Sequence, residues 1–234
     1  MKRVAFFVEG LSEQLFLEKL LLEIFSRNKI VVDCRKISGG SRIPVTITQI
    51  STPTLTVDRE YYVLIYDCGG DANVGSYIRD QRESLKNHGY IKIVGIRDVY
   101  PQFTRSEIPR LLRSIHHGIP QKDIPVKFIL SIMEIESWFL AEETHYPKIN
   151  SSLTLSLIQS NKGFNPDSYD TQLFDMPAIK LNEVYQLVGM RYLKENSNIS
   201  RTINAMDFAN IYFEVQKRIT SLKELINEIN LMFE

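Results

Sequence analysis

The segment Arg3-Val-Ala-Phe-Phe-Val-Glu-Gly-Leu-Ser-Glu13 reads as a buried strand that runs directly into a helix. Residues 4–8 form a short, uninterrupted apolar run rich in Val and Phe, which is typical of a strand buried on both faces. Ser12 is expected to cap a helix over residues 12–27, because apolar residues then recur at helical spacing. Glu9 therefore ends a strand at the edge where open α/β sheets bind ligands.

The composition is that of an ordinary globular protein. The 234 residues are 44% hydrophobic and 24% charged, enough for one full-sized domain with a substantial core. Lys+Arg and Asp+Glu both number 28, so any site for a polyanion must rest on local patches or bound metal ions. Cys34 and Cys68 form neither a disulfide framework nor a CxxC pair, which fits a reducing compartment. Without a signal peptide or an apolar run of about 18 residues, we expect a cytoplasmic protein with no membrane association.

Strands and helices are predicted to alternate along the first part of the chain. The further strands are Ile30–Ile37, Tyr61–Asp67, Ile91–Asp98 and Ile124–Ile132, and the helices lie at about residues 73–87 and 104–116. Residues 45–57 are interpreted as irregular or as an edge strand, since Pro53 interrupts them. This alternation predicts an α/β fold with a mostly parallel sheet flanked by helices on both faces.

The pattern changes near residue 147, where we place a boundary between an α/β domain (1–147) and a mainly helical C-terminal extension (148–234). The extension is expected to pack on the first domain or on a partner chain. Its last part, residues 200–233, has a helical pattern that we divide into two helices with a break near Ser221.

Acidic residues gather at the predicted strand ends. Because the carboxyl ends of parallel strands share one sheet edge, these side chains are expected to lie near one another, and the cluster would repel itself without a cation. Mg²⁺ or Mn²⁺ is the usual neutraliser of such oxygen ligands. The residues are Glu9, Asp67 and Asp98 at strand ends, Glu13 in a first helical turn, and Asp71 and Glu136 just past strands.

Three motifs together resemble the Toprim domains of nucleases, as found in the OLD family and in small Toprim-like proteins of prokaryotic antiphage defence loci. Val-Glu-Gly-Leu-Ser-Glu (8–13) is similar to the motif that opens these domains. Ile-Tyr-Asp-Cys-Gly-Gly-Asp (65–71) falls where the family has its Asp-x-Asp, and residues 133–142 resemble the Glu-x-Trp pattern of the defence-associated branch. The resemblance covers roughly residues 3–142 and implies a Toprim-like fold with metal-dependent phosphodiester chemistry.

The resemblance also implies roles for individual residues. Glu9 would bridge metal or act as general acid–base, and Asp67 would be the first aspartate of the pair, but Gly69 stands where the family has the second. The further metal ligands implied are Glu13, Asp71 and Glu136. The implied activity is that of a Mg²⁺- or Mn²⁺-dependent endonuclease that acts on DNA or RNA. The resemblance also implies an effector controlled by an ATPase, and this ATPase would be a separate polypeptide because the chain has no GxxxxGK[ST] motif. Assembly of the chain into a homodimer is left as a possibility.

Two other functional classes fit the same sequence. A degenerate Toprim module would bind a partner protein or nucleic acid without cutting, and the glycine at position 69 keeps this alternative open. Nucleotidyl transfer would share the metal site but would need a nucleotide pocket that the sequence does not reveal.

Individual residues also have structural interpretations. Glu13 can favour the helix start, Asp71 can cap the next helix, and Glu136 can favour a helix start of its own. Basic residues that could contact substrate phosphates include three in or near a Gly/Ser-rich loop and one on the helix after Asp67, although solvated charges are the equal alternative. These candidates are Arg35, Lys36, Arg42 and Arg79.

Overall fold

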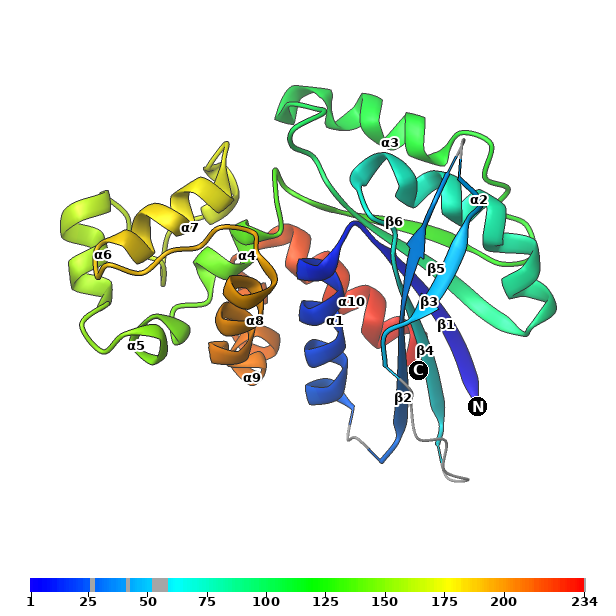
Figure 1. The fold of residues 1–234 in the computed structure, drawn as a ribbon, viewed down its shortest axis with the longest axis horizontal. Coiled ribbons are helices and arrows are strands. Elements are labelled where there is room, and N and C mark those ends of the chain that lie inside the picture. Colours follow the sequence, from blue (N-terminus) through cyan, green and yellow to red (C-terminus); the bar gives the residue numbers. More distant parts are fainter. Residues whose placement is uncertain (26–27, 41–42, 52–58, 234) are drawn as a thin grey trace. The chain divides into compact units, whose positions relative to one another are not determined.

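A six-stranded sheet organises the first half of the chain (Figure 1). The structure, a computed structural model, describes residues 1–25, 28–40, 43–51 and 59–233. The strand order is β3-β2-β4-β1-β5-β6; β1 is parallel to β4 and β5, β2 is parallel to β4, and β3 runs antiparallel to β2. The mostly parallel α/β sheet is therefore confirmed. The strands are β1 (Lys2–Val8), β2 (Ile30–Ser38), β3 (Thr46–Gln49), β4 (Tyr61–Asp67), β5 (Tyr90–Asp98) and β6 (Val126–Ser131).

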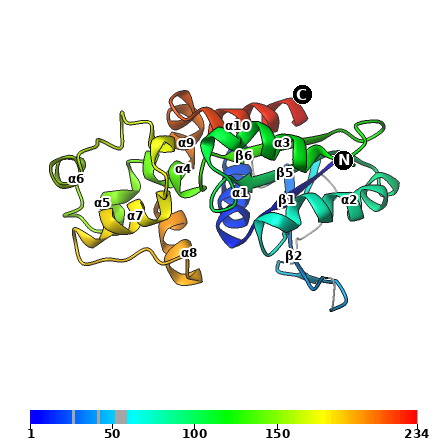
Figure 2. The same cartoon turned by 90° about the horizontal axis from the view of Figure 1, so that it is seen from above.

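Helices cover both faces of this sheet (Figure 1, Figure 2). The chain leaves β1 toward β2 in one direction along the sheet and leaves β4 toward β5 in the other, so right-handed crossovers put α1 on one face and α2 on the opposite face. The helices are α1 (Leu11–Ile24), α2 (Asp71–Asn87) and α3 (Ile108–His116), the last preceded by a 3₁₀ turn (Arg105–Glu107). The neighbouring strands β4 and β1 consequently form a topological switch point, and open α/β sheets bind ligands at the carboxyl ends of such strands.

The central strand is buried on both sides, as its apolar run predicts. All five residues from Val4 to Val8 are 0% exposed. Close packing also fixes a glycine on β5: a Cβ at Gly95 would lie 2.6 Å from ring atoms of Phe128. The helix that follows β1 differs from its prediction at the start. It begins at Leu11 with Gly10 as N-cap instead of Ser12, because the Glu13 carboxylate reaches back to the Gly10 amide.

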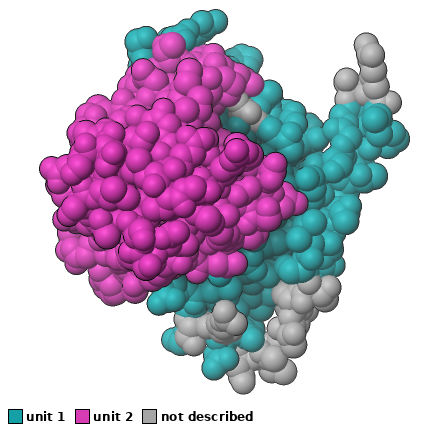
Figure 3. Space-filling model, turned by 60° about the vertical axis from the view of Figure 1, so that its left-hand side comes forward, with its two compact units in different colours: residues 1–97, 106–130, 232–234 teal, residues 98–105, 131–231 magenta. Residues whose placement is uncertain are grey.

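The chain forms two compact units (Figure 3). Unit 1 comprises residues 1–97, 106–130 and 232–234 and holds nearly all of the sheet; unit 2 comprises residues 98–105 and 131–231 and is mainly helical. The residues from 131 to 147, which the sequence boundary assigns to the first domain, thus belong to unit 2. Its helices are α4 (Glu136–Ala141), α5 (His145–Ile149), α6 (Leu155–Lys162), α7 (Pro177–Gln186), α8 (Asn196–Ala205), α9 (Phe208–Phe213) and α10 (Thr220–Phe233), with 3₁₀ turns at Thr171–Leu173 and Val215–Lys217.

The end of the chain is helical, as predicted, but its division is not. Three helices, α8 to α10, replace the two expected, since Asp207 caps α9 by accepting a hydrogen bond from the Asn210 amide. Ser221 lies inside α10, one residue after its start, where its hydroxyl accepts a hydrogen bond from Trp138 Nε1 at 2.8 Å. Among the described residues, no helix has the combined length and hydropathy of a membrane span.

Candidate functional site

Asp67 is the last residue of β4, and Glu9 directly follows the last residue of the adjacent parallel strand β1. Val8 is paired with Asp67 in the β1–β4 register, so Glu9 follows directly at the carboxyl edge. The turn after β4 is bonded to the end of β1: the Cys68 amide donates to the Val8 carbonyl at 2.9 Å, and the Gly70 amide donates to the Glu9 carbonyl at 2.8 Å. The register thus brings the two predicted catalytic residues to one place, at the switch point of the sheet.

The Asp67 side chain is held by its own turn and by a lysine. It is 4% exposed, and its Oδ1 accepts a hydrogen bond from the Gly69 amide at 2.8 Å. Lys36 is opposite Asp67 in the β2–β4 register, and its Nζ lies 3.5 Å from Oδ2. Gly69 has φ +66°, a left-handed conformation that suits glycine. The residue that departs from the Asp-x-Asp pattern is therefore one that the turn itself favours.

Glu13 has a structural partner. It is 5% exposed, and its Oε2 accepts a hydrogen bond from the Gly10 amide at 3.0 Å. This contact satisfies one of the amides at the start of α1, as the helix-start interpretation requires. A role for Glu13 as a metal ligand stays a prediction.

The thiol of Cys68 lies beside the acidic residues at this edge of the sheet. Burial raises the pKa of its thiol, and the negative charges of Asp67 and then Glu9 raise it further. The thiol therefore stays protonated near neutral pH and is unsuited to nucleophilic attack.

Of the basic residues predicted to contact substrate phosphates, those that the structure describes each have a different bonding partner. Arg35 donates from Nε and Nη2 to Asp33 Oδ2, at 3.0 and 2.7 Å, and Lys36 faces Asp67 as described above. Arg79, on the exposed surface of α2, donates to the His117 carbonyl at 3.3 Å. Arg42 and the side chain of Asp71 lie outside the described residues.

Glu136 belongs to unit 2, where its carboxylate is 0% exposed. Tyr192 donates its hydroxyl to Oε1 at 2.7 Å, and Lys194 Nζ lies 3.1 Å from Oε2 and 2.9 Å from an oxygen of Glu134. Burial raises the pKa of Glu136 despite the nearby lysine. Asp98 is likewise engaged within unit 2, where its Oδ1 accepts from the Ile135 amide. These contacts favour structural roles for both residues over the metal role predicted for Glu136, which a metal-binding measurement would test.

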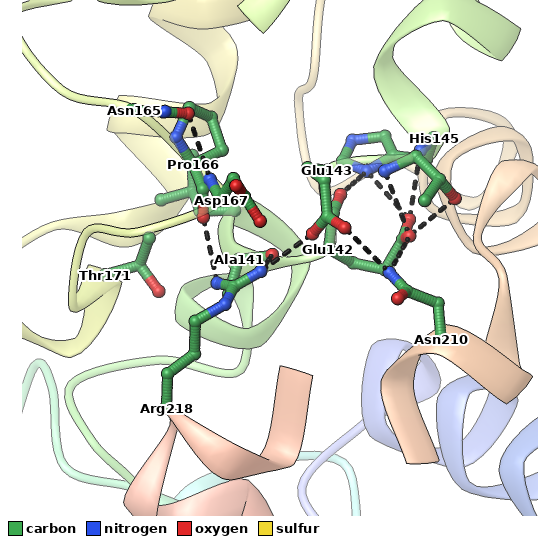
Figure 4. Close-up of polar contacts among 12 residues, drawn as sticks. Ala141, Glu142, Glu143, His145, Asn165, Pro166, Asp167, Thr171, Asn210 and Arg218 are labelled. Atoms are coloured by element: carbon green, nitrogen blue, oxygen red, sulfur yellow. Dashed lines mark hydrogen bonds and ion pairs between the residues drawn. The ribbon is translucent and has the colours of Figure 1, made fainter. Parts of the chain in front are cut away.

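Unit 2 also contains a carboxylate network that sequence reasoning missed (Figure 4). Glu142 is 0% exposed; its Oε1 accepts from Thr144 and from Asn210 Nδ2, and its Oε2 accepts from the His145 amide. Although burial alone raises the pKa of Glu142, the hydrogen bonds from His145, Thr144 and Asn210 hold the pKa below its ordinary value of 4.5. Because Asn210 lies 68 residues away, no local pattern could have revealed the pairing.

An adjoining contact extends this network. Arg218 donates to the Ala141 carbonyl, to the Pro166 carbonyl and to Glu143 Oε2, at 2.6, 2.9 and 2.7 Å (Figure 4). Arg218 thus connects its own segment of unit 2 with residues 141–143 and with Pro166, which are far away in sequence. We interpret the network as structural, since its carboxylates are saturated by donors of the same unit.

Glu9 and Asp67 supply carboxylate oxygens, the donor type that Mg²⁺ prefers, and their role as metal ligands stays a prediction. Among the described side chains, no group of three or more His, Cys, Asp and Glu residues is arranged to hold a metal ion. Mg²⁺ commonly takes only one or two protein carboxylates, however, and completes its shell with water and substrate phosphates. The donor chemistry of the two strand ends meets this requirement. Comparison of the chain with protein-family models, curated proteins and solved structures gave no match.

Proposed function

We propose that this chain is a divalent-metal-dependent phosphodiesterase that cuts DNA or RNA, with Glu9 and Asp67 as its metal-binding carboxylates. The observation that carries the proposal is the β1–β4 register, which pairs Val8 with Asp67, so that Glu9 and Asp67 come from the carboxyl ends of neighbouring strands at the switch point. The resemblance of residues 8–13 and 65–71 to nuclease-type Toprim domains supports the same assignment.

The residues of this edge would divide the work. Asp67 supplies a carboxylate whose orientation is fixed by the Gly69 amide. The half-buried Glu9 supplies the second carboxylate and can take a proton from water. Lys36, half exposed beside Asp67, can turn toward a substrate phosphate. Bound Mg²⁺ or Mn²⁺ would stabilise the charge that develops on the phosphoryl oxygens.

The resemblance further supports a role as the effector of an antiphage defence system under the control of a separate ATPase. The chain itself lacks the GxxxxGK[ST] motif, so nucleotide-driven control would come from a partner polypeptide.

A second function, a non-cleaving Toprim-like module that binds a partner protein or nucleic acid, is favoured by the ion pair at Asp67. Lys36 lies 3.5 Å from the carboxylate and can neutralise it without any metal. Glycine at position 69 replaces the second aspartate of the Toprim pattern, and the Glu13 carboxylate already accepts a hydrogen bond from the Gly10 amide. These three features are what a site that has lost its metal would retain.

A cleavage assay separates the two functions. Single-stranded DNA, duplex DNA and RNA are incubated with the chain in Mg²⁺, in Mn²⁺ and in EDTA. We expect metal-dependent cleavage that falls by about 100-fold or more in Glu9→Gln and in Asp67→Asn, the scale of losing a charge-stabilising group. Asp80→Asn, which neutralises an exposed carboxylate on α2, is the matched control and should retain activity.

Two outcomes would overturn the proposal. Cleavage that survives both strand-end substitutions would remove the assigned site. Absence of cleavage of every substrate, with and without a candidate ATPase, would favour the binding module.

A further inference from the structure

Unit 1 contains a cavity on the other face of its sheet from Asp67. The cavity has a volume of about 410 Å³, within the range of small-molecule sites. Its walls include Arg3, Arg35, Tyr62, Tyr66, Tyr90 and Gln81. Because side chains alternate along a strand, Tyr62 and Tyr66 of β4 point to the face opposite Asp67. The α2 helix, which carries Gln81, borders this face.

A buried carboxylate orients Arg35, which lines the cavity. Asp33 is 1% exposed, and its Oδ2 accepts hydrogen bonds from Tyr62 and from Nε and Nη2 of Arg35. These bonds occupy two of the five guanidinium donors and hold the planar group in place. The arginine thus reaches the cavity already oriented, with its side chain 34% exposed.

Another part of the cavity lining combines a second arginine with aromatic rings. The Arg3 guanidinium lies 5.8 Å from the centre of the Tyr62 ring and donates to the His88 carbonyl at 3.0 Å. Tyr62 and Tyr90 meet edge to face, with ring centres 6.4 Å apart. Burial raises the pKa of Tyr90 to about 12, so its ring stays a neutral aromatic surface at physiological pH.

The charges favour an anion of low charge. Arg3 and Arg35 carry two positive charges, and Asp33 offsets one of them, so a polyphosphate would find too few partners. Guanidinium groups recognise phosphate with two parallel hydrogen bonds, and tyrosine rings provide stacking surfaces for nucleobases. Together these groups match one base and one phosphate group.

We propose that this tyrosine–arginine cavity binds a single nucleotide, with the base against the tyrosine rings and the phosphate at Arg3 and Arg35. The nucleotide can be a free mononucleotide or the terminal nucleotide of a strand, since both present the same base and phosphate. The site is separate from the Glu9–Asp67 edge and does not depend on the function proposed for it.

Binding is measured by isothermal titration calorimetry on the full chain in EDTA, so that no metal-bound nucleotide forms at the carboxylate edge. The probes are AMP, UMP, a 5′-phosphorylated dinucleotide, adenosine and inorganic phosphate. We expect mononucleotides to bind with Kd values of about 1 mM or tighter, and adenosine and phosphate to bind at least about tenfold more weakly. A dinucleotide that binds more tightly than AMP identifies a strand end as the natural ligand, whereas equal or weaker binding identifies the free nucleotide.

Variants test the assignment of the cavity. Arg3→Gln should weaken AMP binding about tenfold or more, the value of a charge-assisted hydrogen bond, and Tyr90→Leu should weaken it about fivefold or more through lost stacking. The matched control is Lys2→Gln, which removes the same charge from the neighbouring, exposed residue of β1 and should leave Kd unchanged.

Thermal unfolding of each variant separates lost binding from lost folding. If Arg3→Gln does not fold, Tyr90→Leu carries the test. The proposal is overturned if no nucleotide binds at concentrations up to about 10 mM, or if folded Arg3→Gln and Tyr90→Leu bind AMP as tightly as the wild type. Asp67→Asn should retain AMP binding in EDTA, so failure here and failure of the nuclease proposal are independent.

Discussion

Buried carboxylates occur in both units of this protein, and their surroundings differ. In unit 2, Glu136 and Glu142 are fully buried, and hydroxyl, amide or ammonium groups of the same unit surround them. In unit 1, Glu9 and Asp67 end neighbouring strands at a glycine turn, and the cation beside Asp67 is a half-exposed lysine.

This difference separates carboxylates enclosed by donors of a helical unit from carboxylates at the carboxyl edge of a sheet. A saturated, buried acid contributes to folding, and its loss leaves donors without acceptors. An acid at the carboxyl edge of a parallel sheet lies where open α/β folds bind ligands. Substitutions in unit 2 should therefore change stability, and substitutions in unit 1 should change metal binding.

The largest expected effect is loss of stability in Glu142→Ala. The substitution leaves the amides of Thr144 and His145 without their acceptor and removes one of the two carboxylates that accept from Asn210, so we expect the free energy of unfolding to fall by about 3 kcal/mol. Chemical denaturation measures it, with Glu214→Ala, which removes an exposed ion pair, as the control. A change below about 1 kcal/mol would contradict the structural role.

The same residue predicts a pH dependence. The pKa of Glu142 lies below its ordinary 4.5 in the folded protein, so its contribution is present above pH 4.5 and is lost as pH falls through the folded pKa. The stability difference between the wild type and Glu142→Gln should shrink between about pH 6 and pH 3. Denaturation curves at several pH values test this; a difference that grows toward acid pH would have the wrong sign.

Gly69→Asp supplies the aspartate that the turn lacks. A Cβ at this position would meet the Ile37 carbonyl at an ordinary 3.7 Å, and aspartate tolerates left-handed φ better than most residues. We expect Mn²⁺ affinity to rise about tenfold, with about 1 kcal/mol of stability lost to backbone strain. The control is Gly89→Asp, at φ +75° with open space around it; a rise of the same size there would show a non-specific charge effect.

The smallest expected effect concerns Lys36→Met. Removing the ammonium group beside Asp67 should raise metal affinity by about three- to fivefold, a modest change because the lysine is 50% exposed. Titration with Mn²⁺ measures it, with Lys29→Met, in an exposed ion pair with Glu60, as the control. Unchanged affinity would mean that Lys36 does not compete with metal for Asp67.

The sheet and its acidic edge were predictable because both depend on local patterns. An apolar run buried on both faces marks a parallel strand, and parallel strands end at a shared edge, so residues 58 positions apart, Glu9 and Asp67, could be placed together from sequence. The N-cap of α1 was predicted two residues late, at Ser12 instead of Gly10, because Glu13 can bond back to the Gly10 amide as readily as Ser12 can cap.

The surroundings of Glu136 and Glu142 could not be predicted. Tyr192, which bonds Glu136, lies 56 residues away between two helices, and Asn210, which bonds Glu142, lies 68 residues away on α9. Amphipathic patterns indicate which face of a helix is buried but not what it meets. The tyrosine–arginine cavity was missed for the same reason, since its walls come from β1, β2, β4, β5 and α2.

Mn²⁺ binding to the wild type and three variants, followed by electron paramagnetic resonance, tests the assignment of the metal site most directly. We predict that Glu9→Gln and Asp67→Asn each weaken binding by about tenfold or more, while Glu136→Gln binds Mn²⁺ like the wild type. Unchanged binding in both unit 1 variants, or a loss confined to Glu136→Gln, would contradict it.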